Sequence, residues 1–290
     1  MKQINKLKKE YDDIEIPSEL DQMVKQSIQR AKASKKKHTP LKQWSIGVAA
    51  AAALFIGSVN VSPTLAQSMA NVPVLGAIVE VITVQTLTMD KETYQAELKT
   101  PAISGLEDKG LQASLNEKYI EENKELFKQF KADVADMEEV GAGHIGIDTG
   151  YEVKTDTDRL LSIARYEVNT VGSSSTTMKY DTIDKQNNIL ITLPSLFKDD
   201  SYIEVISSYI AGEMKQQMAD NEDISYFAFE GSDLDFQAIH SDQNFYITAD
   251  HKLVISFDKY EVAPGYMGVV TFEIPSAILG DVLVSDTYIQ

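Results

Sequence analysis

An uncharged apolar stretch near the N-terminus limits the folds open to this chain. No charged side chain occurs from Trp44 to Val79, and the run WSIGVAAAAALFIGSVNV, Trp44–Val61, holds 18 residues. As an α-helix this run is about 27 Å long, close to the roughly 30 Å of a bilayer's hydrocarbon core. We expect residues 44–61 to form a transmembrane signal-anchor helix. The competing interpretation is a buried, alanine-rich core helix.

The two sides of this stretch carry opposite charge. Residues 1–43 hold 11 of the 27 basic and 6 of the 44 acidic residues, which leaves 16 basic and 38 acidic residues beyond Val79. Basic flanks of a membrane span stay in the cytoplasm, and five lysines precede this one: Lys32, Lys35, Lys36, Lys37 and Lys42. The sequence therefore predicts a single-pass protein of the cell membrane with a cytoplasmic N-terminus and an extracellular C-terminal domain.

The strongly acidic charge of the part beyond Val79 limits which partners it can attract. Such a field repels nucleic acid and attracts cationic proteins, mainly by steering their encounter at low salt. The chain contains no cysteine, which excludes disulfides, thiolate metal sites and a cysteine nucleophile.

The cytoplasmic arm, residues 1–43, contains one helix signal. Ser18 is a candidate N-cap for a helix from about Glu19 to Ala33. An apolar stripe recurs on it at helical spacing: Leu20, Met23, Val24 and Ile28. A lone helix of this length is marginal in water, so we expect it to bind in the groove of a partner. The alternative is an amphipathic helix lying on the inner leaflet.

The segment after the span, residues 62–74, has the composition of a cleavable linker. Pro63 breaks the helix, and Ala66 and Ser68 offer the small side chains that signal peptidase accepts three residues and one residue before a cut, here before Met69. Small residues placed there by chance are the alternative.

The outer domain, residues 75–290, is predicted to be α+β, with an antiparallel sheet and two main helices. Helices are expected at 108–137, ended by the glycines at 141 and 143, and at 202–218. Strands are expected at 93–98, 151–155, 160–170, 176–182, 189–193, 245–248, 253–257 and 269–274. The apolar run Val72–Val84 either rests on the membrane or opens the fold.

The sequence offers no arrangement of residues for catalysis. Its histidines, His38, His144, His240 and His251, have no metal-ligand spacing, and no nucleophile elbow or phosphate-binding glycine loop occurs. We expect a binding protein without enzymatic activity, cofactor or metal.

Two loops are candidates for the binding surface. Pro264 restricts the connection between two predicted strands, and Tyr266 beside it offers a large amphipathic ring at modest entropic cost. The alternative is a tyrosine folded back on the core. The serine-rich turn Gly172–Ser175 would add adaptable polar groups, or serve only as a turn.

Two segments resemble a known family. DHKLVISFDKYEVAPGYMGVVTFEIP, Asp250–Pro275, resembles the C-terminal signature of RsiV-type anti-sigma factors, and TPAISGLEDKGLQASLNEKY, Thr100–Tyr119, resembles an earlier segment of the same family. The resemblance extends to the arm motif IPSEL and the lysine cluster before the span, and so covers nearly the whole chain.

The resemblance implies a transmembrane inhibitor of an extracytoplasmic-function (ECF) sigma factor of the sigma V type. It implies that the arm holds the sigma factor, that lysozyme binds the outer domain, and that signal peptidase and then an intramembrane site-2 protease release the arm. By the same resemblance, lysozyme binding is assigned to Ser173 or Ser174, Pro264, Gly265 and Tyr266. Cleavage is assigned to the Ala66–Ser68 stretch, where the residue before the cut is serine and not the more usual alanine. The rival hypotheses are a peptidoglycan-binding module and a membrane-anchored lysozyme inhibitor without a transcriptional role.

Overall fold

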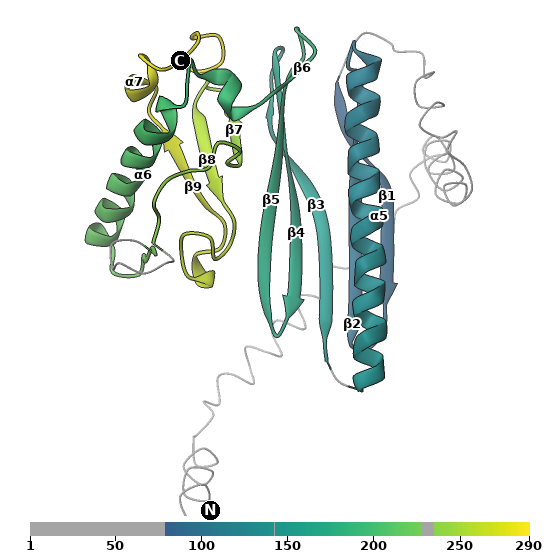
Figure 1. Ribbon diagram of the computed structural model, residues 1–290. Coiled ribbons are helices and arrows are strands. Elements are labelled where there is room, and N and C mark those ends of the chain that lie inside the picture. Colours follow the sequence, from purple (N-terminus) through teal and green to yellow (C-terminus); the bar gives the residue numbers. More distant parts are fainter. Residues whose placement is uncertain (1–78, 142, 228–234) are drawn as a thin grey trace, which may run out of the picture. The chain divides into compact units, whose positions relative to one another are not determined.

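The structure, a computed structural model, describes residues 79–141, 143–227 and 235–290 (Figure 1). They form a mixed α+β domain with two sheets. The elements in chain order are β1 (Glu80–Asp90), β2 (Tyr94–Ser104), α5 (Lys109–Val140), β3 (Ile145–Asp156), β4 (Leu160–Val171), β5 (Ser173–Asp184), β6 (Ile189–Ile191), η2 (Leu193–Leu196), α6 (Ser201–Asp220), β7 (Phe245–Ile247), β8 (Leu253–Phe257), η3 (Gly265–Met267), β9 (Val270–Ile274) and α7 (Ser276–Leu279).

The larger sheet contains six strands in the order β1-β2-β3-β4-β5-β6. Its neighbours pair antiparallel except β2 and β3, which run parallel. Parallel neighbours need a long crossover connection, and α5 supplies it. The predicted antiparallel meander is therefore confirmed for β3 to β6, whereas the sheet as a whole is mixed.

Helix α5 has well-defined ends. The Asp108 side chain accepts hydrogen bonds from the backbone N–H groups of Gly110 and Leu111, at 2.7 and 3.0 Å, and so caps the N-terminus. Gly141 ends the helix with a φ of 72°, and its N–H bonds to the Met137 carbonyl. The predicted long helix and its glycine stop are confirmed.

Apolar and polar contacts fix α5 on the sheet. Phe130 and Val134 pack with Leu98 of β2 in one buried cluster, and Leu115 packs with Ile163 of β4 in another. The buried Asn116 side chain bonds both backbone groups of Ile103, at 2.7 and 2.8 Å, which fixes the helix against β2.

The second unit of the fold, here called the C-terminal module, comprises α6, the antiparallel sheet β7-β8-β9 and α7. It lies on the side of β5 (Figure 1). The Met178 N–H of β5 donates to the Asp258 carboxylate at 2.7 Å, and the Tyr180 hydroxyl donates to Ser256 at 3.0 Å. The middle of β5 is therefore held against the end of β8 and the loop that follows it.

Some predicted boundaries were wrong. The sequence did not predict β1, and the observed β2, β3 and β5 are longer than the expected strands 93–98, 151–155 and 176–182. The expected four-residue turn 172–175 is also corrected. Only Gly172, with a φ of 73°, lies outside the strands, because Ser173, Ser174 and Ser175 pair with β4.

In the described part of the chain, every residue of the buried apolar clusters lies between positions 79 and 290. The largest lies mainly in the C-terminal module, with Ile206, Leu253 and Phe272, and it also includes Leu160 of β4 and Ile191 of β6. A fragment of residues 75–290 therefore contains the whole of these cores and is suitable for binding measurements.

Asp184, at the end of β5, is fully buried and ties the C-terminal segment to the larger sheet. Its carboxylate accepts the Asn187 N–H at 2.8 Å and the Tyr288 hydroxyl at 2.8 Å, and it pairs with Arg159 at 3.0 Å. Burial alone would raise the pKa of Asp184, but these partners outweigh it and hold the pKa below its usual value of 3.8.

This lowered pKa gives a pH-dependent stability. A carboxyl whose folded-state pKa is depressed stabilises the fold above its unfolded pKa and loses that contribution as pH falls through the folded one. The Asp184→Asn variant should therefore unfold at a lower temperature than wild type at pH 7. This difference in unfolding temperature should narrow below about pH 4. Thermal unfolding across pH checks this. A constant difference down to pH 2 contradicts it.

Candidate functional site

The predicted binding residues lie in two segments, the start of β5 and the connection between β8 and β9. Ser173 and Ser174 begin β5 directly after the Gly172 turn. Pro264 precedes the 3₁₀ turn η3, which contains Gly265 and Tyr266 and joins β8 to β9. The segments are far apart in sequence, so only the fold can bring them together.

Lys259, in the connection between β8 and β9, links this connection to the start of β5. Its ammonium group donates to the Ser174 hydroxyl at 2.9 Å, and its backbone N–H donates to the Thr176 carbonyl at 3.0 Å. Ser173 beside them is exposed. The structure thus brings the serine segment into contact with the β8–β9 connection. We call the surface formed by Ser173, Ser174, Lys259, Gly265 and Tyr266 the tyrosine surface.

Tyr266 is the most exposed aromatic side chain of this surface. Its exposed fraction is 67%, so the ring is not folded back on the core. Its hydroxyl donates to the Asp223 carbonyl at 3.0 Å, and the Met267 N–H bonds to the Pro264 carbonyl at 2.9 Å. These contacts hold an amphipathic ring in place without burying it, as an interface anchor requires.

Sequence analysis missed a second exposed aromatic residue, Tyr260. Its exposed fraction is 45% and its backbone φ is 76°. Its ring lies against Gly265, where an added Cβ would overlap the ring atoms. No local pattern in the sequence signals this, because the turn conformation and the contact with Gly265 both come from the folded loop.

Acidic side chains border Tyr266. Asp220 ends α6, and Glu222 and Asp223 follow it; all three are exposed. Because the Tyr266 hydroxyl is bonded to the Asp223 backbone, this acidic segment lies beside the ring. The surroundings of Tyr266 therefore favour a partner of positive charge.

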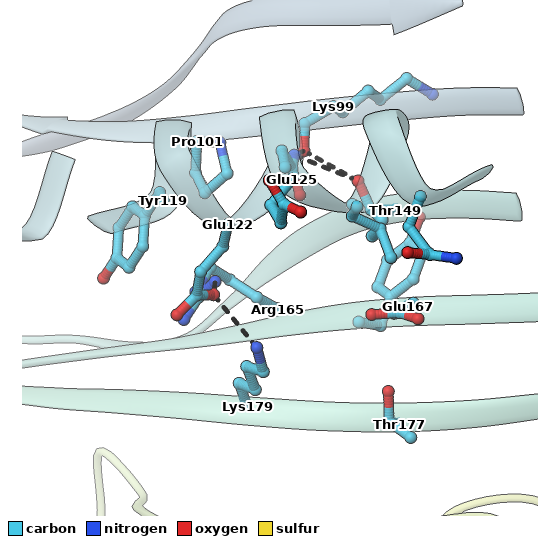
Figure 2. A pocket seen from close by; sticks show the side chains of 15 residues that line it. Lys99, Pro101, Tyr119, Glu122, Glu125, Thr149, Arg165, Glu167, Thr177 and Lys179 are labelled. Atoms are coloured by element: carbon cyan, nitrogen blue, oxygen red, sulfur yellow. Dashed lines mark hydrogen bonds and ion pairs between the residues drawn. The ribbon is translucent and has the colours of Figure 1, made fainter. Parts of the chain in front are cut away.

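A separate hollow of about 420 Å³ lies between α5 and the larger sheet (Figure 2). Arg165, on its floor, is largely buried and donates to Glu122 at 2.7 Å and to Asp181 at 3.3 Å. Its guanidinium carbon lies 4.2 Å from the centroid of the Tyr119 ring, and Lys179 also pairs with Glu122. These charges pair with one another, which indicates a structural ion network.

The pKa values in this hollow agree with that assignment. Burial alone would raise the pKa of Glu122, but Arg165 and Lys179 lower it below its usual range. Burial also opposes the charge of Arg165, but Asp181 and Glu122 raise its pKa. Each partner thus keeps the other ionised.

Other predicted residues lie outside the described part of the chain. These are the arm residues Leu20, Met23, Val24 and Ile28, the span Trp44–Val61, and the cleavage residues Ala66, Ser68 and Met69. Of the helices within the described ranges, none combines the length and apolar character needed to cross a bilayer. Across residues 79–141, 143–227 and 235–290, no group of three or more potential ligand side chains is placed to hold a metal ion.

Comparisons with known proteins first define the class of fold. A family model described as "Domain of unknown function (DUF4179)" matches residues 36–127, and one described as "Protein of unknown function (DUF3298)" matches residues 194–277. The solved structure of a DUF3298-family protein from Bacteroides fragilis has a TM-score of 0.52 at 17% identity, covering 72% of this chain and 94% of its own. One from Pseudomonas aeruginosa PAO1 has a TM-score of 0.52 at 12% identity, covering 74% and 97%. The chain has the α+β fold of DUF3298 proteins.

A curated relative gives the family. Anti-sigma-V factor RsiV of Bacillus subtilis strain 168 is 44% identical over 290 residues, which cover 100% of this chain and 99% of the relative. The chain therefore belongs to the RsiV family of anti-sigma-V factors. This confirms the resemblance seen in the segment Asp250–Pro275. An anti-sigma factor is a regulatory protein and not an enzyme.

Proposed function

We propose that this anti-sigma factor holds an ECF sigma factor of the sigma V type at the cell membrane and releases it when its outer domain binds lysozyme. In this proposal residues 1–43 form the cytoplasmic arm, 44–61 the membrane span, 62–74 the cleavable linker and 75–290 the lysozyme-binding domain. The abrupt change from a basic N-terminus to an acidic remainder supports this topology.

The arm is the proposed site of sigma-factor binding. The stripe formed by Leu20, Met23, Val24 and Ile28 would lie in a groove of the sigma factor. The membership of the chain in an anti-sigma-V factor family supports a sigma factor as the partner. Retention at the membrane then keeps the sigma factor from transcription.

The observation that carries the lysozyme proposal is the tyrosine surface. Tyr266 is exposed yet held through its hydroxyl, and the serine segment lies on the same surface through Lys259. Central, rigid aromatic side chains contribute most of the energy in many protein interfaces. Lysozyme is strongly basic, and the acidic residues Asp220, Glu222 and Asp223 beside the ring suit such a partner.

Release would follow from proteolysis in the linker. Signal peptidase would cut between Ser68 and Met69, with Ala66 as the other small residue it requires, and an intramembrane site-2 protease would then free the arm. The chain itself catalyses no step. Its role is to make the cut depend on lysozyme.

Cleavage of the full-length chain in membranes tests this proposal. Lysozyme should convert the tagged wild-type chain to a shorter N-terminal fragment, and Ser68→Trp should block the conversion, because a bulky residue directly before the cut is not accepted. Gln67→Trp is the matched control, since the position between the two small residues tolerates a large side chain. Equal cleavage with and without lysozyme would refute the proposed trigger.

A further inference from the structure

Tyr260 occupies a backbone conformation that is costly for its residue type. Among the described non-glycine residues, positive φ angles occur at Asn188, His251 and Tyr260. Asparagine and histidine are enriched in this region, whereas a bulky aromatic residue there is an outlier. Such outliers persist only where the surrounding structure imposes them, and they cluster at functional sites.

The turn around Tyr260 imposes this conformation. The Glu261 N–H bonds to the Asp258 carbonyl at 3.0 Å, and the Asp258 N–H bonds to the Glu261 carboxylate at 2.6 Å. Glycine would fit the same turn without strain. The presence of tyrosine therefore calls for a reason that lies in its side chain.

Packing in the core does not supply that reason. Val262 and Ala263, which follow in sequence, are 3% and 1% exposed and belong to the core of the C-terminal module. Tyr260 is 45% exposed, and its ring lies against the backbone of Gly265. The contact explains why position 265 has no side chain, and it leaves much of the ring in solvent.

The ring is continuous with the tyrosine surface. Gly265, which it contacts, directly precedes Tyr266, and Lys259, which directly precedes it, bonds to Ser174. The Lys259 ammonium group also lies 5.2 Å from the centroid of the Tyr260 ring. Two exposed phenol rings thus flank one glycine, beside an exposed acidic segment.

We propose that Tyr260 is a second aromatic anchor of the tyrosine surface and contacts the same basic protein as Tyr266. The inference rests on the proposed function, in which that protein is lysozyme. Anchors cluster near the centre of an interface, where the contacts around them exclude water. The strained turn then serves to place the Tyr260 ring beside Tyr266, with Gly265 leaving room for it.

Two substitutions at position 260 distinguish the effect of the ring on binding from the effect of the strained backbone. Tyr260→Gly removes the ring and relieves the positive φ, whereas Tyr260→Ala removes the ring and keeps the strain. Ile189→Ala is the control, because Ile189 is 48% exposed and pairs with Asp184 at the end of β5 opposite to Ser173. Binding of each 75–290 fragment to hen lysozyme is measured by calorimetry, with thermal unfolding alongside.

We expect both Tyr260 variants to lose at least about tenfold in affinity, which corresponds to about 1.4 kcal/mol. Tyr260→Gly should unfold at or above the wild-type temperature, and Ile189→Ala should bind as wild type does. If Tyr260→Gly binds like wild type while Tyr266→Ala is weakened, the proposal for Tyr260 is overturned and the proposed function stands. If the wild-type fragment does not bind, the lysozyme-sensing function itself is overturned.

Discussion

Replacing Tyr266 with alanine is expected to weaken binding of the 75–290 fragment to hen lysozyme by more than about 2 kcal/mol, or roughly thirtyfold. The side chain is 67% exposed, so the loss should come from the interface and not from the core. Calorimetry of both fragments measures the change. Thermal unfolding should reveal no more than the loss of the hydrogen bond to Asp223, about 1 kcal/mol, because the ring itself is exposed.

A conservative variant shows which part of Tyr266 matters. Tyr266→Phe removes the hydrogen bond to Asp223, which contributes about 1 kcal/mol in a typical case. It should therefore bind between wild type and Tyr266→Ala. If Tyr266→Ala binds as tightly as wild type, Tyr266 is not an anchor, and the partner must contact a different surface.

The largest expected loss of stability follows from Arg165→Ala. Removal of one partner of a buried ion pair typically costs about 3–5 kcal/mol, and without Arg165 the Glu122 carboxylate would keep only the exposed Lys179 as its partner. Here Asp181, only 2% exposed, would keep Lys118 as its remaining ion-pair partner. Denaturant unfolding should show this loss. Lys124→Ala is the control, because it breaks only the exposed pair with Glu121 and should cost about 0.5 kcal/mol or less.

The same variant separates stability from binding. The hollow that holds Arg165 is lined by α5 and β2 to β5 and contains none of the residues of the tyrosine surface. Folded Arg165→Ala fragment should therefore bind lysozyme with wild-type affinity below its unfolding temperature. A loss of stability under 1 kcal/mol would show that the network does not hold α5 to the sheet.

Elements with local signals could be predicted from the sequence. Asp108 and Gly141 mark the ends of α5, and the apolar periodicity between them is helical. The strand β1 could not be predicted in the same way. Its first residues, Glu80–Val84, belong to the largely apolar run that begins at Val72, and only pairing with β2 distinguishes a strand there from a membrane-resting segment.

The candidate site could be predicted loop by loop, but not as a surface. Proline, glycine and serine identified the two segments, and exposure of Tyr266 is consistent with the anchor interpretation. The bond between Lys259 and Ser174 joins residues 85 positions apart, and no sequence pattern encodes such a contact. Tyr260 was missed because its positive φ is imposed by the folded turn.

The central claim, that the outer domain recognises lysozyme, is tested most directly by calorimetric titration of the wild-type 75–290 fragment with hen lysozyme at low and at physiological salt. Another basic protein of similar size serves as the control for charge alone. We predict saturable binding to lysozyme that weakens with salt but persists at physiological strength, and no such binding to the control. Absence of binding at low salt, or equal binding to both proteins, would contradict the claim.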